Sequence, residues 1–219
     1  DQIEPIAAHW KQENIAFEAI YTGYLGSFEQ IDLMKQFFDD FKTDRNFIFV
    51  DPAMADNGKL YPGFDAAFVE AMKGLCGKAD YIVPNITESC FLTGMEYRTE
   101  YDKAYIESLV QGLQALGCQN IILTGVSYRP GKTGIVVVEN GVQSYYEHEL
   151  LPNSCHGTGD IYASAFVGAL LRGKTALCAA QIAADYTMAC IKATAEEENH
   201  WYGAKFEPVL MQLIQALEA

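Results

Sequence analysis

The amino-acid sequence predicts an α/β fold with a mostly parallel central sheet, helices on both faces and an antiparallel edge hairpin. Short apolar strands alternate with helical segments through the first 125 residues. The strands are apolar at consecutive positions, which is typical of parallel strands that are buried on both faces. The Asn140-Gly141 dipeptide between two further strand-like runs predicts the hairpin.

The parallel strands are expected where short apolar runs end in polar or turn-forming residues. Residues 47–50, for example, read Phe-Ile-Phe-Val and are followed by Asp51-Pro52. The expected strands cover residues 19–22, 47–50, 81–83 and 121–123, and the hairpin covers 135–138 and 142–146.

Helices are expected where apolar residues recur every three or four positions. Ser27 followed by Gln30 has the spacing of a capping box and predicts that one helix begins there. The expected helices cover residues 3–10, 28–41, 64–75, 88–92, 102–116, 159–171, 176–195 and 208–217.

Length and composition favour one globular domain over residues 1–219. The formal net charge of −14 argues against nucleic acid or an anionic membrane as the partner. None of the six cysteines forms a C-x-x-C pair, so we expect reduced thiols and a cytoplasmic protein. Because the chain opens with a helix, we also expect that N-terminal strands of the domain are absent from it.

Polar residues follow several of the predicted strands, and the carboxyl ends of parallel strands are where such sheets bind ligands. Asp51, Asn85, Glu88 and Asp160 should therefore lie along one edge. The three acidic groups among them suit Mg²⁺ that is held partly through water next to substrate phosphates. The alternative is purely structural: Asn85 or Thr87 could cap a helix, and Asp51 could begin a turn.

The most specific motif is Gly157-Thr158-Gly159-Asp160 before a predicted helix. Two glycines allow a tight turn, and free amides at the helix N-terminus favour bound anions. Such a site binds phosphate without any lysine, which suits an acidic chain. Asp160 in the first turn could accept a proton from an attacking hydroxyl. Alternatively, Asp160 only complements the helix dipole.

Four stretches of the chain resemble the pyridoxal/pyridoxamine (vitamin B6) kinases of the ribokinase superfamily. Asp51-Pro52-Ala53-Met54-Ala55-Asp56-Asn57-Gly58-Lys59-Leu60-Tyr61 resembles the stretch that distinguishes B6 kinases. The other three are Thr22-Gly23-Tyr24, the stretch at 79–88, and Gly157 to Asp160, which marks the superfamily as a whole.

The resemblance implies a ribokinase-like fold and a role for each matching residue. Asp160 would be the base that deprotonates the substrate's 5′-hydroxymethyl group, and amides of Gly157, Thr158, Gly159 and Asp160 would hold the γ-phosphate. Asn85, Thr124, Gly125 and Thr158 would contact ATP, and Tyr61 would lie near the B6 substrate. Asp51, Asp56 and Glu88 would form the Mg²⁺ region.

The activity implied is ATP-dependent phosphorylation of pyridoxal, pyridoxamine or pyridoxine in pyridoxal 5′-phosphate salvage. ATP, Mg²⁺ and a monovalent cation such as K⁺ are the expected cofactors, and a homodimer is the expected assembly. Two alternatives stay open: a hydroxymethylpyrimidine kinase of thiamine synthesis, and a non-catalytic fragment that binds nucleotide or B6.

Overall fold

A computed structural model describes residues 2–152, 155–197, 200 and 202–219. The chain divides into two compact units, Asp1–Thr124 and Gly125–Ala219. Each unit is described by itself below, and the expectation of a single kinase domain stays a prediction.

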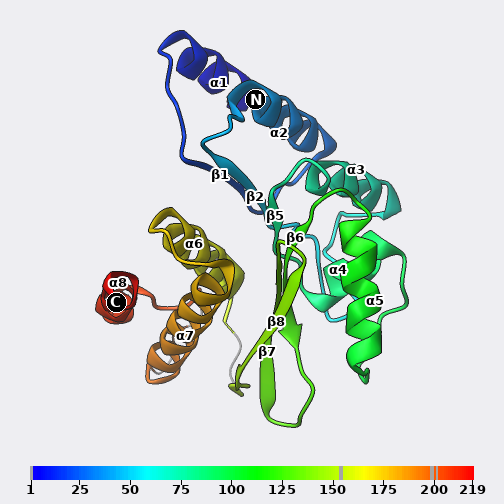
Figure 1. Cartoon of the computed structure of the whole chain (residues 1–219), viewed down its shortest axis with the longest axis vertical. Helices are drawn as coiled ribbons and strands as arrows, with labels where there is room; N and C mark the ends of the chain where they lie inside the picture. Colours follow the sequence, from blue (N-terminus) through cyan, green and yellow to red (C-terminus); the bar gives the residue numbers. More distant parts are fainter. Residues whose placement is uncertain (1, 153–154, 198–199, 201) are drawn as a thin grey trace. The chain divides into compact units, whose positions relative to one another are not determined.

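The first unit contains the parallel sheet that the apolar runs predict, apart from Gly125 and Val126 at the end of its last strand. Strands β1 (Ala19–Thr22), β2 (Phe47–Val50), β5 (Tyr81–Ile82) and β6 (Asn120–Val126) lie side by side in this order, and each adjacent pair is parallel (Figure 1). Phe49, Val50, Ile82 and Ile121 are fully buried. Consecutive apolar positions therefore mark strands covered on both faces, as expected.

Five helices connect and cover these strands. They are α1 (Ile3–Gln12), α2 (Phe28–Phe41), α3 (Ala66–Cys76), α4 (Ile86–Thr93) and α5 (Lys103–Gln114). Each helix contacts the next one in chain order. The strand order advances in one direction, so right-handed crossovers place the connecting helices on the same face of these four strands.

One predicted helix start and one predicted capping box need correction. Helix α3 begins at Ala66 rather than at residue 64, since the Asp65 side chain accepts a hydrogen bond from Phe68 N at 2.9 Å. Ser27 caps α2 as expected, but Gln30 accepts from Gly26 N rather than completing a capping box with Ser27. The motif therefore gave the right helix start but only half of its hydrogen bonds.

A small hairpin that the sequence analysis did not predict lies within residues 51–61. It consists of β3 (Ala55–Asp56) and β4 (Lys59–Leu60), which pair antiparallel. The turn between them has left-handed backbone at Asn57 (φ 50°) and Gly58 (φ 75°). Asn-Gly is the usual dipeptide for such a turn, so this signal was available in the sequence.

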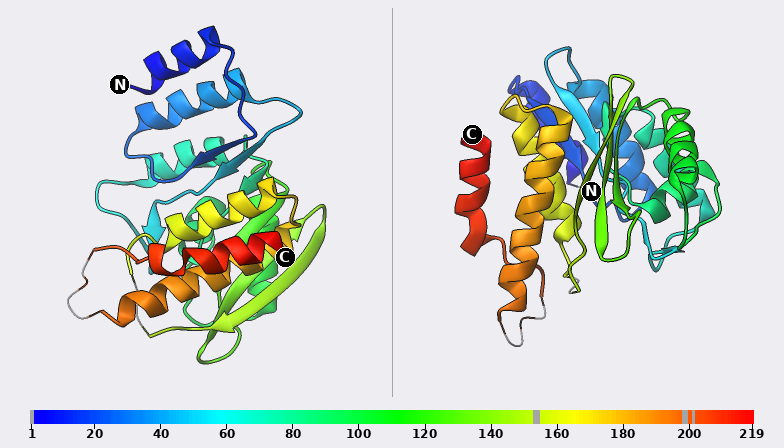
Figure 2. Two further views of the ribbon diagram at one scale, coloured as in Figure 1. Left: turned by 90° about the vertical axis from the view of Figure 1, so that its left-hand side faces the viewer. Right: turned by 60° about the horizontal axis from the view of Figure 1, so that its bottom comes forward.

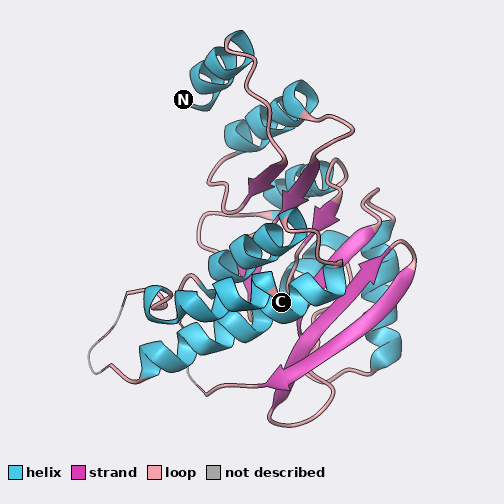
Figure 3. Cartoon of the chain, turned by 60° about the vertical axis from the view of Figure 1, so that its left-hand side comes forward, coloured by secondary structure: helices cyan, strands magenta, loops and turns pink. Residues whose placement is uncertain are grey.

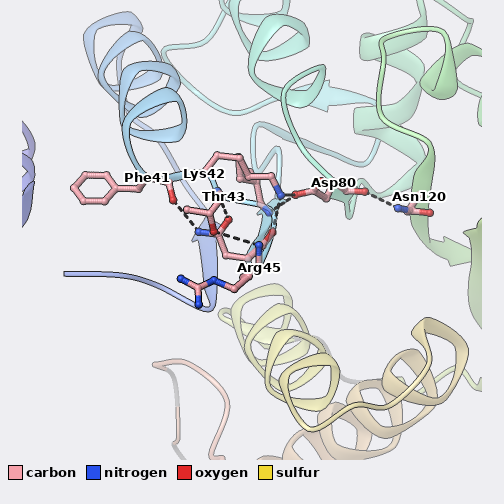
Figure 4. A network of polar contacts seen from close by, with 8 residues as sticks. Phe41, Lys42, Thr43, Arg45, Asp80 and Asn120 are labelled. Atoms are coloured by element: carbon pink, nitrogen blue, oxygen red, sulfur yellow. Dashed lines mark hydrogen bonds and ion pairs between the residues drawn. The ribbon is translucent and has the colours of Figure 1, made fainter. Parts of the chain in front are cut away.

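A polar network ties the beginnings of neighbouring strands together (Figure 4). Asp80 Oδ2 accepts hydrogen bonds from Lys42 Nζ and from Ile48 N, both at 2.6 Å. Asn120 Nδ2 donates to Asp80 O at 2.9 Å, and Asn46 Nδ2 donates to Phe41 O at 2.8 Å. This network lies at the amino ends of β2, β5 and β6, at the opposite edge from the strand ends considered below.

The second unit contains the predicted antiparallel hairpin. Strands β7 (Lys132–Glu139) and β8 (Val142–Glu149) are longer than predicted and pair along their full length (Figure 3). Glu139 pairs with Val142, so Asn140 and Gly141 form a two-residue turn with positive φ. The expected fold class is confirmed: a mostly parallel sheet with helices and an antiparallel hairpin.

The helices of the second unit are α6 (Thr158–Leu171), α7 (Ala176–Ala195), the 3₁₀ helix η1 (Glu207–Val209) and α8 (Leu210–Glu218). Helix α7 packs against α6, α8 and both hairpin strands, and the three α-helices run side by side (Figure 2). No helix in the described part of the chain has both the length and the apolar character needed to cross a membrane.

Candidate active site

Asn85 and Thr124, two predicted nucleotide contacts, lie next to each other in the first unit. They form an isolated parallel bridge, and Thr124 N donates to Pro84 O at 3.0 Å. The Asn85 side chain accepts from Glu88 N at 2.9 Å, and its Nδ2 donates to Ala55 O at 2.9 Å. The structural alternative, in which Asn85 caps a helix, is therefore confirmed, and its contact with ATP stays a prediction.

Glu88 is the most buried carboxylate near these strand ends, with 3% of its surface exposed. Its Oε1 accepts a hydrogen bond from Met54 N at 3.1 Å, and its Oε2 accepts one from Asn85 N at 2.8 Å. The second bond completes a capping box at the start of α4. Glu88 thus joins the 51–61 stretch to α4, a structural role that the sequence analysis missed.

A third contact holds the β3–β4 turn against the same helix. Gly58 N donates to Thr87 Oγ1 at 3.0 Å. A Cβ atom at residue 58 would lie 2.8 Å from the Tyr97 ring, and φ is 75° there, so both space and conformation favour glycine. We call Asp51, Met54, Asn85, Thr87 and Glu88 the strand-end cluster.

The electrostatics of the strand-end cluster favour a bound cation. Burial raises the pKa of Glu88 well above its ordinary value, and the negative charge of Asp51 raises it further. Hydrogen bonds from the backbone amides of Asn85 and Met54 oppose this rise in pKa but do not cancel it. Two nearby carboxylates, one of them desolvated, form a pair that a divalent cation would stabilise in the charged form.

The three predicted metal-region residues are not all brought together. Asp51 and Glu88 interact electrostatically, whereas exposed Asp56 accepts hydrogen bonds from Asn57 N and Asn57 Nδ2 in the β3–β4 turn. Among the described residues, no three His, Cys, Asp or Glu side chains form a group suited to a metal ion. A metal here would therefore need oxygen ligands beyond these carboxylates, and Mg²⁺ ordinarily takes them from water and phosphate.

Two other predicted contact residues, Tyr61 and Gly125, are exposed. Tyr61 is 36% exposed and follows β4, with its N–H bonded to Met54 O at 2.8 Å. Gly125 is exposed near the end of β6 and has φ 76°, and a Cβ built there meets no atom within 4 Å. Their roles toward substrate and nucleotide stay predictions.

In the second unit, Gly157, Thr158, Gly159 and Asp160 form the turn that opens α6, which we call the glycine turn. Gly157 is the N-cap and has φ 83°, and no side-chain hydrogen bond caps this helix within the described residues. Ile161 N bonds to Gly157 O at 3.0 Å. The first amides of a helix have no partner inside the helix, so this end offers N–H donors to an anion.

Asp160 lies exposed in the first turn of α6. The residue also lines a mostly apolar pocket of about 340 Å³, with Ile161 and Ser164 of α6 and Leu210 and Leu213 of α8. The carboxylate is therefore accessible to a small ligand, as a proton acceptor must be. The expectation that Asp160 lies along one strand edge with Asp51, Asn85 and Glu88 stays a prediction.

Comparison with known proteins assigns the family. A family model described as phosphomethylpyrimidine kinase matches residues 6–205. The chain belongs to this family. The predicted resemblance is thereby confirmed at the level of a pyridoxal or phosphomethylpyrimidine kinase of the ribokinase superfamily.

Two curated relatives carry different activities in their names. Pyridoxal kinase of Dictyostelium discoideum is 28% identical over 172 residues, which is 72% of this chain and 55% of the relative. Hydroxymethylpyrimidine/phosphomethylpyrimidine kinase of Aquifex aeolicus is 26% identical over 185 residues, or 82% of this chain and 69% of the relative. The chain thus spans about half to two thirds of the length of these relatives.

Solved structures agree with the fold. A putative phosphomethylpyrimidine kinase of Bacteroides thetaiotaomicron aligns with a TM-score of 0.91 and 34% identity over 96% of this chain and 74% of its own. A second crystal form of that protein contains pyridoxal. Pyridoxal kinase of Leishmania donovani, in complex with ADP and pyridoxamine, aligns with a TM-score of 0.82 and 19% identity over 97% of this chain and 77% of its own, and therefore supports the fold alone.

Proposed function

We propose that this kinase transfers the γ-phosphoryl group of ATP to the 5′-hydroxymethyl group of a B6 vitamer, with Asp160 as the base. The observation that carries the proposal is the glycine turn: an exposed carboxylate in the first turn of a helix that begins at a left-handed glycine and that no described side chain caps. The Bacteroides relative that was crystallised with pyridoxal supports the choice of substrate.

The chemistry requires few protein groups. The hydroxymethyl oxygen attacks the γ-phosphorus, the bond to the β–γ bridging oxygen breaks, and ADP leaves. Asp160 accepts the hydroxyl proton, and the amides of the glycine turn stabilise the negative charge on the transferring group. Positioning and charge stabilisation supply most of the catalysis in phosphoryl transfer, and neither requires a lysine.

Mg²⁺ fits the strand-end cluster as a partner of nucleotide phosphates. Asp51 and Glu88 would supply oxygen ligands, Glu88 through water, and we also assign Asp56 of the β3–β4 turn to the metal region. When bound, the ion would neutralise phosphate charge. The proposal further assigns ATP contacts to Asn85, Thr124, Gly125 and Thr158, a substrate contact to Tyr61, and a homodimeric assembly.

Hydroxymethylpyrimidine kinase is the second candidate, because the Aquifex relative carries this activity in its name. The family model is described as phosphomethylpyrimidine kinase, a related pyrimidine kinase. Both substrates present a hydroxymethyl group on a nitrogen-containing aromatic ring. The glycine turn serves either one equally well, so the reaction type does not depend on this choice.

A coupled assay of ADP release with pyridoxal, pyridoxamine, pyridoxine and hydroxymethylpyrimidine tests the proposal. We expect kcat/KM for the best B6 vitamer to exceed that for the pyrimidine by about tenfold or more, which is the discrimination that one or two ring contacts provide. Preference for the pyrimidine would overturn the substrate assignment. Nucleotide binding without turnover on any of the four would instead identify a non-catalytic binding protein.

A further inference from the structure

We infer that Thr194, at the far end of α7, is a positioning residue for the glycine turn. It acts through residues 203–206, which we call the return segment because here the chain comes back to the start of α6. The inference rests on the proposed function in one respect: the turn is taken to bind the phosphoryl group that is transferred. All of the contacts described below lie within the second unit.

The return segment is attached to α7 by two side chains. The buried hydroxyl of Thr194 donates to Cys190 O at 2.7 Å and accepts from Lys205 N at 2.8 Å. Eight residues earlier on α7, Tyr186 Oη donates to Phe206 O at 3.0 Å. Each tie uses a largely buried polar group, and such groups are costly to leave unpaired.

The return segment in turn contacts the residue before the glycine turn. Ala204 N donates to His156 O at 3.0 Å. His156 O belongs to the same peptide group as Gly157 N. Because a trans peptide is planar, its N–H points opposite to its C=O, so this hydrogen bond sets the direction of the Gly157 amide.

The glycine turn therefore receives its orientation from both sides. On the helix side, Gly157 O accepts from Ile161 N at 3.0 Å. On the other side, the Ala204–His156 bond fixes the peptide group that leads into the turn, at a helix start that no described side chain caps. Gly157 has φ 83°, and glycine can adopt many backbone conformations. Hydrogen bonds from outside the turn therefore keep its amide in one direction.

Helix α7 offers a matched control for Thr194. Thr187 lies two turns earlier, and its Oγ1 donates to Ala183 O at 2.7 Å, the same bond to the residue four positions back that Thr194 makes. Valine at either position removes that bond while keeping the shape of the side chain. Only Thr194→Val also removes the acceptor of Lys205 N.

We expect Thr194→Val to lower kcat about tenfold. Complete removal of an oxyanion donor lowers kcat by a factor of about 10²–10³, and a change in the direction of one amide should have a smaller effect. Affinity for ADP, which lacks the γ-phosphate, should change less than twofold. Thr187→Val should stay within about twofold of wild type, and Thr194→Ser, which keeps the hydroxyl, should restore kcat. Tyr186→Phe removes the hydrogen bond to Phe206 O and should also lower kcat.

An NMR experiment makes the outcome independent of activity. In ¹⁵N-glycine-labelled protein, with the Gly157 resonance assigned through Gly157→Ala, this resonance should shift in Thr194→Val and remain in place in Thr187→Val. Equal effects of the two valine variants, on kcat or on the resonance, would overturn the inference. If the wild-type chain shows no turnover, the proposed function fails but the resonance still decides the positioning role.

Discussion

The strand-end cluster and the glycine turn both offer groups suited to phosphates or their counter-ions, yet they are held in different ways. In the cluster, side chains hold the backbone in place. The Glu88 carboxylate accepts hydrogen bonds from the backbone amides of Met54 and Asn85, and the Thr87 hydroxyl accepts one from Gly58 N. At the glycine turn, backbone fixes backbone, through the bond from Ala204 N to His156 O.

The difference follows from what each region contributes. Burial and the charge of Asp51 raise the pKa of Glu88, and a bound cation would favour the charged form of its carboxylate. Amides that stabilise a transferring phosphoryl group carry no net charge and need only a fixed direction. The first region should therefore respond to pH and divalent ions, whereas the second should respond to changes in geometry.

The largest effect is expected at Asp160. Asp160→Asn keeps the size of the side chain but removes the proton acceptor, so turnover should fall by about 10²-fold or more while ATP affinity changes little. Asp102→Asn is the control, because Asp102 also lies at a helix start, where its side chain accepts from Tyr105 N. Steady-state kinetics together with nucleotide titration measure both quantities. Full turnover in Asp160→Asn would exclude the general-base role.

An intermediate effect, dependent on pH, is expected at Glu88. The folded-state pKa is raised, so between the ordinary value of about 4.3 and the raised value the folded protein keeps a proton that the unfolded chain releases. Wild-type stability should therefore fall relative to Glu88→Gln as pH rises through this window, by at most about 1.4 kcal/mol per pH unit.

Urea unfolding between pH 4 and pH 8 measures this difference between wild type and Glu88→Gln. The variant loses one hydrogen bond from a backbone amide at every pH, which lowers its stability by a constant amount. The change of the stability difference with pH is therefore the informative quantity. Millimolar Mg²⁺ at pH 8 should stabilise wild type more than the variant, because a bound cation favours the charged carboxylate. Parallel stability curves, unchanged by Mg²⁺, would show that Glu88 does not titrate in this range.

The smallest effect is expected in the network around Asp80, at the amino ends of the parallel strands. Lys42 bonds to Asp80 through a partly exposed ammonium, and exposed ion pairs contribute only about 0.2–1 kcal/mol. Lys42→Met should therefore lower the free energy of unfolding by less than about 1 kcal/mol and leave kcat unchanged. Thermal unfolding and the coupled assay test this. A substantial loss of kcat would show that the opposite edge of the sheet also sets the geometry of the site.

The sequence by itself determined the order of the elements and the position of the glycine turn. Some elements depend on interactions between near neighbours in the chain and can be predicted from local sequence patterns. Examples are the apolar strand Phe47–Val50 and the Asn140-Gly141 turn. The Asn57-Gly58 hairpin was equally legible but was not predicted. Resemblance of four short stretches then supplied the family, which the match over residues 6–205 confirms.

Only the tertiary structure decided what holds the candidate site in place. The hydrogen bond between Met54 and Glu88 joins residues 34 positions apart, and the one between Ala204 and His156 joins residues 48 positions apart (204 minus 156). No local sequence pattern could therefore predict either bond. Thr194 reads in the sequence as an ordinary residue near a helix end, and its tie to Lys205 depends on the path of the chain after α7. Local propensity fixes elements, but the direction of an amide or the pKa of a carboxylate is set by whatever the fold brings beside it.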